Sequence, residues 1–322
     1  MPRDVVVAFV HGIYSENASY SNDMQDCLRR ALPPRLRPHL KFAPVFWGEI
    51  VRPHSRNFLH QIESQSRLRP TLARRFIVEG LGDAAAYQKT HKRENSAYYL
   101  IQQQITETLR RVDAHEDPSR PLVFIAHSLG CHIVSSYAWD ISRMRQMSEA
   151  ELAEWDDRHV TRFVRAMRTW PPMRRLETLA GIVTMGSNMP LFTFSFGPEN
   201  VFPITRSKDA DKKPAFPGSL LPAHVAVGAR WLNFYSRRDL LSYPLKPLNN
   251  AYRDEARIED IRVQSEPWWS RVLLPGALGA PHAHSGYWTN RIVIARTAAL
   301  LAGVIEAEDG RGDTSGATGP WT

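Results

Sequence analysis

Short apolar runs without polar alternation recur along the chain. The first, Val5 to Val10, is six residues long and contains four valines. A run of this length, rich in β-branched residues, is typical of a strand buried on both faces of a parallel sheet. The same signature returns over residues 121–126, 179–185 and 231–235. The pattern therefore predicts a sheet with at least four buried parallel strands.

Amphipathic helices are predicted between these runs. Apolar side chains three or four residues apart form one stripe on a helix surface. Two such stripes are Tyr98, Ile101, Ile105, Leu109 and Val112, and then Val134, Tyr137 and Ile141. Strands that alternate with helices indicate an α/β fold. We expect a doubly wound, mostly parallel sheet within one domain over residues 1–306.

Three segments break this alternation. Residues 143–175 are highly charged but carry apolar side chains at helical spacing, and we expect a helical cap-like insertion over the carboxyl edge of the sheet. Residues 198–222 contain five prolines and predict a long surface loop. Residues 307–322 are rich in Gly, Ser, Thr and Asp and predict a disordered tail. The apolar stripe of the cap-like insertion is Val160, Phe163, Val164 and Met167.

The composition is that of a globular protein. Of 322 residues, 43% are hydrophobic and 23% charged, which excludes a wholly disordered, collagen-like or coiled-coil chain. Two cysteines, Cys27 and Cys131, make neither a disulfide framework nor a zinc site by themselves and fit a reducing compartment. No segment approaches the ~20 apolar residues of a membrane span, and the first apolar run is too short for a secretion signal. We expect a soluble, cytoplasmic protein.

The net charge of +8 comes almost entirely from arginine, because only seven of the 41 basic residues are lysines. Such a balance favours anionic partners. The arginines are scattered singly or in pairs and form no compact basic tract. We therefore expect no nucleic-acid partner. The charge leaves contact with a membrane surface open without supporting it.

Candidate chemistry begins where the run 121–126 ends. A nucleophile on a sharp turn between a strand and a helix needs small residues two positions before and after it, because the backbone folds back tightly there. Ala126 and Gly130 meet this need around Ser128. The turn also aims the N-terminus of the next helix at Ser128, so the backbone N–H of Leu129 can stabilise an oxyanion. The alternative is a serine that only caps a helix.

The segment Ala126 to Cys131 resembles the nucleophile elbow of the α/β-hydrolase superfamily, with Ala126 in place of the first glycine of Gly-x-Ser-x-Gly. The resemblance implies an α/β-hydrolase fold, with Ser128 as the nucleophile. His11-Gly12-Ile13, directly after the first predicted strand, resembles the loop that supplies the second oxyanion donor in this superfamily. The resemblance places that donor on the backbone N–H of Ile13, with Gly12 allowing close approach of the backbone.

The acid of such a site is expected in a loop after a late strand. The strand predicted over residues 231–235 is followed by a short turn and then by Asp239, which resembles the acid segment of lipase-like and esterase-like hydrolases. The carboxylate would orient an imidazole and stabilise its protonated form. Asp254 lies in a charged stretch and Asp260 within a strand-like segment over residues 257–263, so both are weaker candidates.

The base is expected last, before the final helix. His282 and His284 both lie there, followed by Tyr287-Trp288 and then by an amphipathic segment over residues 288–304. The family pattern of His, one or two small residues and Tyr-Trp favours His284, with His282 as the alternative. Whichever histidine serves must lie within hydrogen-bond reach of Ser128.

Other residues near the predicted strand ends receive structural or pocket roles. His127 and His132 have no carboxylate or cysteine at ligand spacing, so no metal site is predicted and His127 is expected to pack beside Ser128 as part of the pocket. Cys131 is expected to fill space in the core. Gly12 is expected to line the substrate pocket as well. The apolar walls of this pocket are predicted to be Met189, Leu191 and Phe192.

Together these features predict a serine hydrolase of carboxylic esters, similar to carboxylesterases and lipases, without a cofactor. The expected partner is a small-molecule or lipid ester, held under a cap that favours medium acyl chains over acetate. The alternative is a catalytically silent hydrolase fold that binds a partner protein. The sequence does not distinguish ester from thioester or amide, because one triad serves all three.

Overall fold

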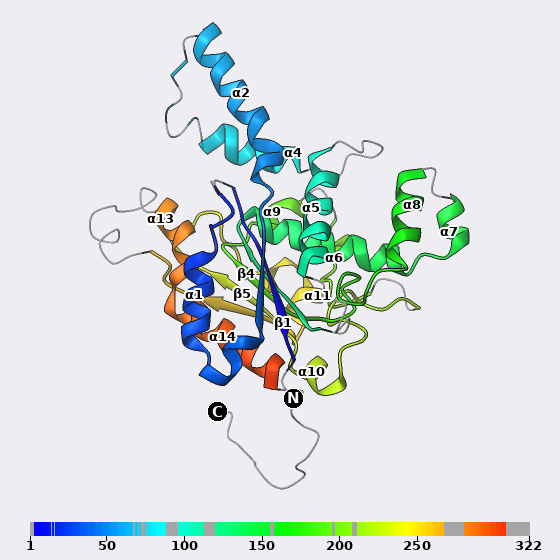
Figure 1. Ribbon diagram of the computed structural model, residues 1–322. Coiled ribbons are helices and arrows are strands. Elements are labelled where there is room, and N and C mark those ends of the chain that lie inside the picture. The colour runs from blue at the N-terminus through cyan, green and yellow to red at the C-terminus, as the bar shows by residue number, and fades with distance from the viewer. Residues whose placement is uncertain are drawn as a thin grey trace.

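The computed structural model describes residues 3–13, 15, 17–66, 68–69, 71, 74, 76–87, 96–112, 120–154, 158–194, 197–207, 211–266 and 280–306. Its centre is a six-stranded sheet in the order β2-β1-β3-β4-β5-β6, in which every neighbouring pair is parallel (Figure 1). The strands are β1 (Val5–Val10), β2 (Leu40–Val45), β3 (Leu122–His127), β4 (Leu179–Met185), β5 (Arg230–Tyr235) and β6 (Ile258–Arg262).

Helices cover both faces of this sheet. The longer ones are α1 (Asn22–Ala31), α2 (Gly48–Ser66), α5 (Ala97–Val112), α6 (Leu129–Arg145), α8 (Arg158–Met167) and α14 (Arg291–Glu306). The shorter ones are α4 (Gly82–Ala86), α7 (Glu149–Glu154), α9 (Met189–Phe192), α10 (Ala223–Gly228), α11 (Asn250–Arg253) and α13 (Ala280–Ser285), with a single π-helical turn, η2 (Phe76–Leu81), before α4. The chain thus forms an α/β fold, as the alternating pattern predicted.

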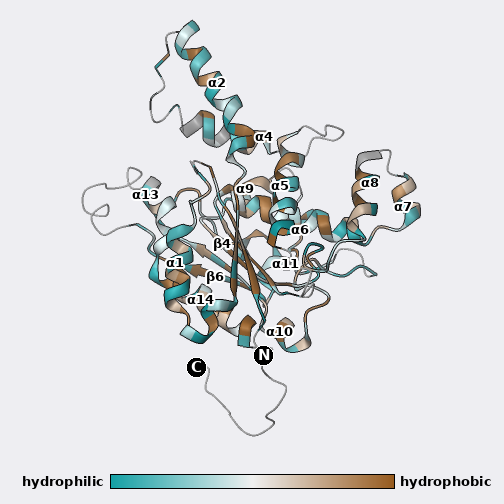
Figure 2. Cartoon of the chain, viewed as in Figure 1, coloured by the Kyte–Doolittle hydropathy of each residue, from teal (hydrophilic) through white to brown (hydrophobic). Residues whose placement is uncertain are grey.

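The side chains of β1 show how the two faces are filled. Val5, Val7 and Phe9 pack with α1 and α14, whereas Val6, Ala8 and Val10 pack with α5 and α6. Because successive strand residues point to opposite faces, an apolar run without alternation fits only a strand covered on both sides. All six residues of β1 are buried, and the hydropathy colouring shows the apolar strands inside a more polar outer layer (Figure 2).

The four apolar runs all became strands, and the segment over residues 257–263 became the edge strand β6. The pattern missed the other edge strand, β2, whose burial alternates and whose Pro44 weakens the strand signal. It also missed the segment between β2 and α5. There α2, η2 and α4 rise beyond the carboxyl ends of the strands.

The cap-like insertion is helical, but two residues of the stripe expected to face the site pack elsewhere. Val160 and Val164 of α8 form a small cluster with Met147 and Leu152, against the end of α6. Phe163 contacts Trp170 edge to face, with 5.2 Å between the ring centroids. The expectation that this stripe covers the site mouth is therefore wrong for Val160 and Val164. Their apolar surface is satisfied by the helices of their own insertion.

The segment 198–222 is also more than a surface loop. It contains a short 3-10 turn at Pro198–Asn200, and the side chains of Ile204 and Phe216 are buried in the main core. The predicted tail, 307–322, lies outside the described residues. Among the described helices, none combines the length and the apolar character that a membrane crossing needs.

The start of α6 generates a first prediction, because it passes directly over the end of β1. A Cβ on Gly130 would lie 2.4 Å from the carbonyl oxygen of Val10 and 2.6 Å from that of His11. Gly130→Ala should therefore lower the free energy of unfolding by about 1–3 kcal/mol, as measured by urea denaturation.

Gly303→Ala is the matched control, since Gly303 lies within α14 and a Cβ there would meet nothing within 4 Å. This variant should gain up to ~1 kcal/mol of stability, because alanine favours a helix over glycine. Equal stability of the Gly130 and Gly303 variants would contradict the close contact.

Candidate functional site

The candidate site lies where the winding of the sheet reverses. From β1 the chain moves outward to β2 and then returns to the other side of β1 to form β3. Ligands bind outside the carboxyl ends of the strands at such a reversal, because the loops there diverge. His11 and Gly12 follow β1 at this point, and Ser128 follows β3.

Ser128 occupies a tight turn between β3 and α6. Its φ of 55° lies in the left-handed region, which costs free energy for a residue with a side chain. A hydrogen bond of 2.9 Å from its backbone N–H to the carbonyl oxygen of Met185 ties the turn to the end of β4. The residue is 1% exposed. Strained backbone of this kind clusters at functional sites, because surrounding structure must hold it.

A continuous chain of hydrogen bonds starts at this serine. The Nε2 atom of His284 lies 2.8 Å from Ser128 Oγ, and Nδ1 of the same ring lies 2.9 Å from both carboxylate oxygens of Asp239. The carboxylate only accepts, so Nδ1 carries the proton and Nε2 accepts from the serine hydroxyl. Three residues that lie far apart in the sequence thus form one polar chain.

Asp239 is held as a carboxylate inside the protein. Burial alone would raise its pKa, but the hydrogen bond and charge of His284, the backbone N–H of Leu241 and the hydroxyl of Tyr287 together bring the pKa below its usual value. Leu241 N donates over 3.0 Å and Tyr287 Oη over 2.9 Å. A buried carboxylate needs such donors to remain ionised.

The competing candidates lie in other environments. Asp260 accepts hydrogen bonds from Asn233 and from the backbone N–H groups of Leu245 and Lys246, so it fastens the segment after Asp239 to β6. Asp254 ends the short helix α11. His282 is exposed on α13, whereas His284 reaches Ser128. The structure thus brings Ser128, His284 and Asp239 together.

The loop after β1 presses against Ser128. A Cβ on Gly12 would lie 2.4 Å from the Cβ and 3.0 Å from the Oγ of Ser128, so only glycine fits. Ile13, the predicted oxyanion donor, is the next residue along. Leu129, the other predicted donor, is the first residue of α6, where backbone N–H groups have no acceptor within the helix.

Trp47 fixes His11 at the start of this loop. Its backbone N–H donates to His11 Nε2 over 3.1 Å, its indole N–H donates to the His11 carbonyl over 2.9 Å, and the two rings stack at 4.7 Å. His11 Nδ1 therefore carries the proton and donates to the carbonyl oxygen of Gly12 over 2.6 Å. Burial lowers the pKa of His11 to about 3, so the ring is neutral.

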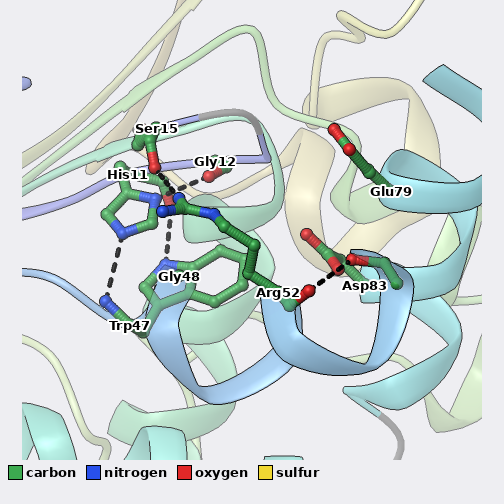
Figure 3. Close-up of a pocket in the computed structure, with 9 residues that line it drawn as sticks. His11, Gly12, Ser15, Trp47, Gly48, Arg52, Glu79 and Asp83 are labelled. Carbon is green, nitrogen blue, oxygen red and sulfur yellow. Dashed lines mark hydrogen bonds between the residues drawn. The ribbon is translucent and has the colours of Figure 1, made fainter. Parts of the chain in front are cut away.

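A pocket opens beside the loop, between His11 and Gly12 on one side and α2 and α4 on the other (Figure 3). The guanidinium of Arg52 points toward the loop and donates to the carbonyl oxygen of Ser15. Its charge also lies over the Phe46 ring, with 5.6 Å to the ring centroid. A Cβ on Gly48 would meet this guanidinium, so the glycine at the start of α2 leaves room for it.

Two carboxyl groups, Glu79 and Asp83, line the opposite side of the pocket. Burial and the neighbouring charge of Glu79 raise the pKa of Asp83 to about 7, and the charge of Arg52 opposes this shift. The segment between β2 and α5 therefore supplies a cation and two acids beside the loop that carries Ile13.

The predicted pocket residues have mixed outcomes. Gly12 and His127 contact the site, since His127 Nε2 donates to the backbone carbonyl of His284 over 2.6 Å. Met189 is buried, Leu191 is exposed, and Phe192 stacks on His132 with 4.1 Å between ring centroids. All three lie in α9, and none of them is among the residues that line the pocket in Figure 3. Their role as acyl walls stays a prediction.

Four residues that support the site were not predicted from the sequence. Tyr287 was noted only for its spacing from His284, although its hydroxyl holds Asp239. A Cβ on Gly186, which has φ +60°, would lie 3.1 Å from Asp239 Oδ2 and 3.2 Å from His284 Cε1. Trp47 and Arg52 lie 36 and 37 residues from their loop partners His11 and Ser15. A glycine directly after a predicted strand end was the one signal available for Gly186.

No family model matches the chain, and no curated protein matches its sequence at a significant level. Within the part of the chain that the structure describes, no group of three His, Cys, Asp or Glu side chains is placed to hold a metal ion.

The buried histidines generate a prediction of stability against pH. Burial lowers the pKa of His11 and His127 to about 3 and that of His132 to about 4. In the unfolded chain these groups take up protons near pH 6.5, so below that pH the unfolded state binds more protons than the folded one. Each should cost about 1 kcal/mol of stability per pH unit between pH 6 and the folded pKa.

The measurement is thermal unfolding across this range. The melting temperature should fall as the pH drops from 7 toward 5, and His132→Phe should fall less steeply than the parent because it removes one of these protons. A melting temperature that stays constant down to pH 5 would contradict neutral, buried histidines.

Proposed function

We propose that the chain is a serine hydrolase that cleaves carboxylic esters and that its sheet is an α/β-hydrolase fold. The observation that carries this proposal is the hydrogen-bond chain from Ser128 through His284 to Asp239, mounted on a strained turn between a strand and a helix. A nucleophile, a base and a group that orients the base are the three parts that such catalysis needs. They follow in the order Ser, Asp, His, as in the superfamily that the elbow resembles.

In the acylation step, Ser128 Oγ attacks the ester carbonyl carbon while its proton passes to His284 Nε2. The carbonyl oxygen becomes an oxyanion, which the backbone N–H groups of Leu129 and Ile13 stabilise. The C–O bond to the alcohol then breaks, and the leaving oxygen takes the proton from His284. Asp239 stays ionised throughout and stabilises the imidazolium.

In the second step, water attacks the acyl-enzyme carbonyl and gives its proton to His284. The new tetrahedral intermediate collapses, the bond to Ser128 Oγ breaks, and the proton returns to that oxygen. The products are the alcohol and the carboxylic acid, and Ser128 and His284 are regenerated.

Arg52 has a positioning role in this proposal. It bonds to Ser15, two residues beyond Ile13, so it restrains the loop that carries one oxyanion donor. Trp47 restrains the start of the same loop at His11. A donor held in place before the reaction stabilises a developing charge without a reorganisation cost.

The first test is Ser128→Ala. The variant should lose esterase activity by on the order of 10⁴-fold or more and should no longer be labelled by a fluorophosphonate, while its thermal unfolding stays close to that of the parent. A panel of acetate, butyrate and octanoate 4-nitrophenyl esters supplies the activity measurement. Ser64→Ala, on the exposed end of α2, is the matched control and should retain parent activity and labelling.

If the parent is neither active nor labelled, the catalytically silent alternative gains support. If Ser128→Ala is as active as the parent, another residue is the nucleophile.

The second test concerns Arg52. Arg52→Met should lower kcat about 10- to 100-fold with little change in KM, because loosening an oxyanion donor costs less than removing it, which is worth about 10²–10³. Arg56→Met, one helical turn later and exposed, is the control and should retain parent kinetics. A folded Arg52→Met variant with parent kcat would exclude the positioning role.

A further inference from the structure

The segment after β2 is strongly basic. Residues 50–75 contain six arginines, no lysine and one acidic residue, Glu63, which gives them +5 of the chain's formal charge of +8. Some arginines elsewhere pair with nearby carboxylates, as in Arg35 with Glu306 at 2.6 Å and Arg110 with Glu107 at 2.7 Å. Glu79 and Asp83 lie in the pocket with Arg52, but Glu63 alone cannot neutralise the other five arginines, so this segment keeps a positive potential.

The described part of the basic segment, residues 50–66, 68–69, 71 and 74, stands at the carboxyl edge of the sheet. It follows β2, whose last residue pairs with the last residue of β1, so it begins level with His11 and Gly12. Figure 1 shows α2 projecting outward beyond this edge. Only Gly48, Val51 and Leu59 of its nineteen residues are buried, so most of the helix surface does not face the rest of the protein.

Large apolar side chains are exposed along the same edge. Phe58 and Leu68 of the basic segment are 50% and 45% exposed. Phe194, just beyond α9 after β4, is 76% exposed, and Leu240, directly after Asp239, is 59% exposed. Arg237, two residues before Asp239, is exposed as well. Basic and apolar side chains thus share the edge at which Ser128 lies.

We propose that this edge, led by the basic segment 50–75, binds the surface of an anionic lipid membrane. Arginines close to such a surface are attracted by lipid headgroups, and Phe or Leu side chains enter the boundary between headgroups and hydrocarbon. A nucleic acid would use the same charge, but its backbone gives exposed leucines no apolar surface to bury. The combination therefore favours a lipid surface. This binding does not depend on the proposed hydrolase activity.

The test is sedimentation of the full-length Ser128→Ala chain with vesicles, so that hydrolysis plays no part. The chain should sediment with phosphatidylcholine vesicles that contain phosphatidylserine and should not sediment with phosphatidylcholine alone. Binding should be lost in 1 M salt, where the Debye length falls to about 3 Å.

Two charge variants locate the surface. Arg56→Gln with Arg69→Gln should lower the partition coefficient about 25-fold, because each arginine near the surface contributes about a factor of five. Arg30→Gln with Arg35→Gln lies at the amino edge, before β2, and should change it less than twofold. Both variants lose the same net charge, so a difference between them reports position alone. Phe58→Ser with Leu68→Ser should weaken binding to the same vesicles.

Three outcomes would overturn the proposal. The first is that the parent chain does not sediment with anionic vesicles. The second is that the two charge variants lose vesicle binding equally. The third is that the chain binds a single-stranded oligonucleotide but not the vesicles. The last result would assign the basic segment to nucleic acid. An active hydrolase that fails the vesicle test would leave the proposed function standing.

Discussion

The site depends on one close contact, in which the turn between β3 and α6 crosses the end of β1. A Cβ on Gly130 would overlap the carbonyl oxygens of Val10 and His11, and a Cβ on Gly12 would overlap the side chain of Ser128. Interiors are packed too densely to give way there, so neither position accepts a side chain without a shift of backbone. Ser128, which has a positive φ, is thus held at the carboxyl edge of the sheet.

The polar groups around this contact are kept in defined protonation states by burial. His11 and His127 are neutral, and each donates one ring N–H to a backbone carbonyl of the site, that of Gly12 and that of His284. Asp239 remains ionised because an imidazole, a hydroxyl and a backbone N–H donate to it. Neutral histidines brace the loops without competing for the carboxylate, so the negative charge of Asp239 is directed at His284.

The segment between β2 and α5 contributes both to the pocket and to the proposed membrane surface. Its inner side contributes Arg52 and Asp83 to the pocket beside Gly12, and its outer side carries the basic and apolar residues of the proposed membrane surface. A segment anchored at the loop after β1 and exposed to a lipid surface would place the membrane at the edge where Ser128 lies. In α8, by contrast, Val160 and Val164 pack with Met147 and Leu152 next to α6.

The sequence by itself determined the α/β class and its buried strands, because an apolar run such as Val5 to Val10 has one stable environment, a sheet covered on both faces. It also identified Ser128 as a candidate, since the small residues around it reflect a local backbone requirement. Local patterns favoured Asp239 and His284 but left other acids and His282 open. Only the tertiary structure decided among them, because the contact between Asp239 and His284 joins residues 45 positions apart. It also decided that Arg52 reaches Ser15 and that Val160 packs within its own insertion. Both contacts depend on which parts of the chain lie next to each other after folding, and local sequence patterns do not determine this.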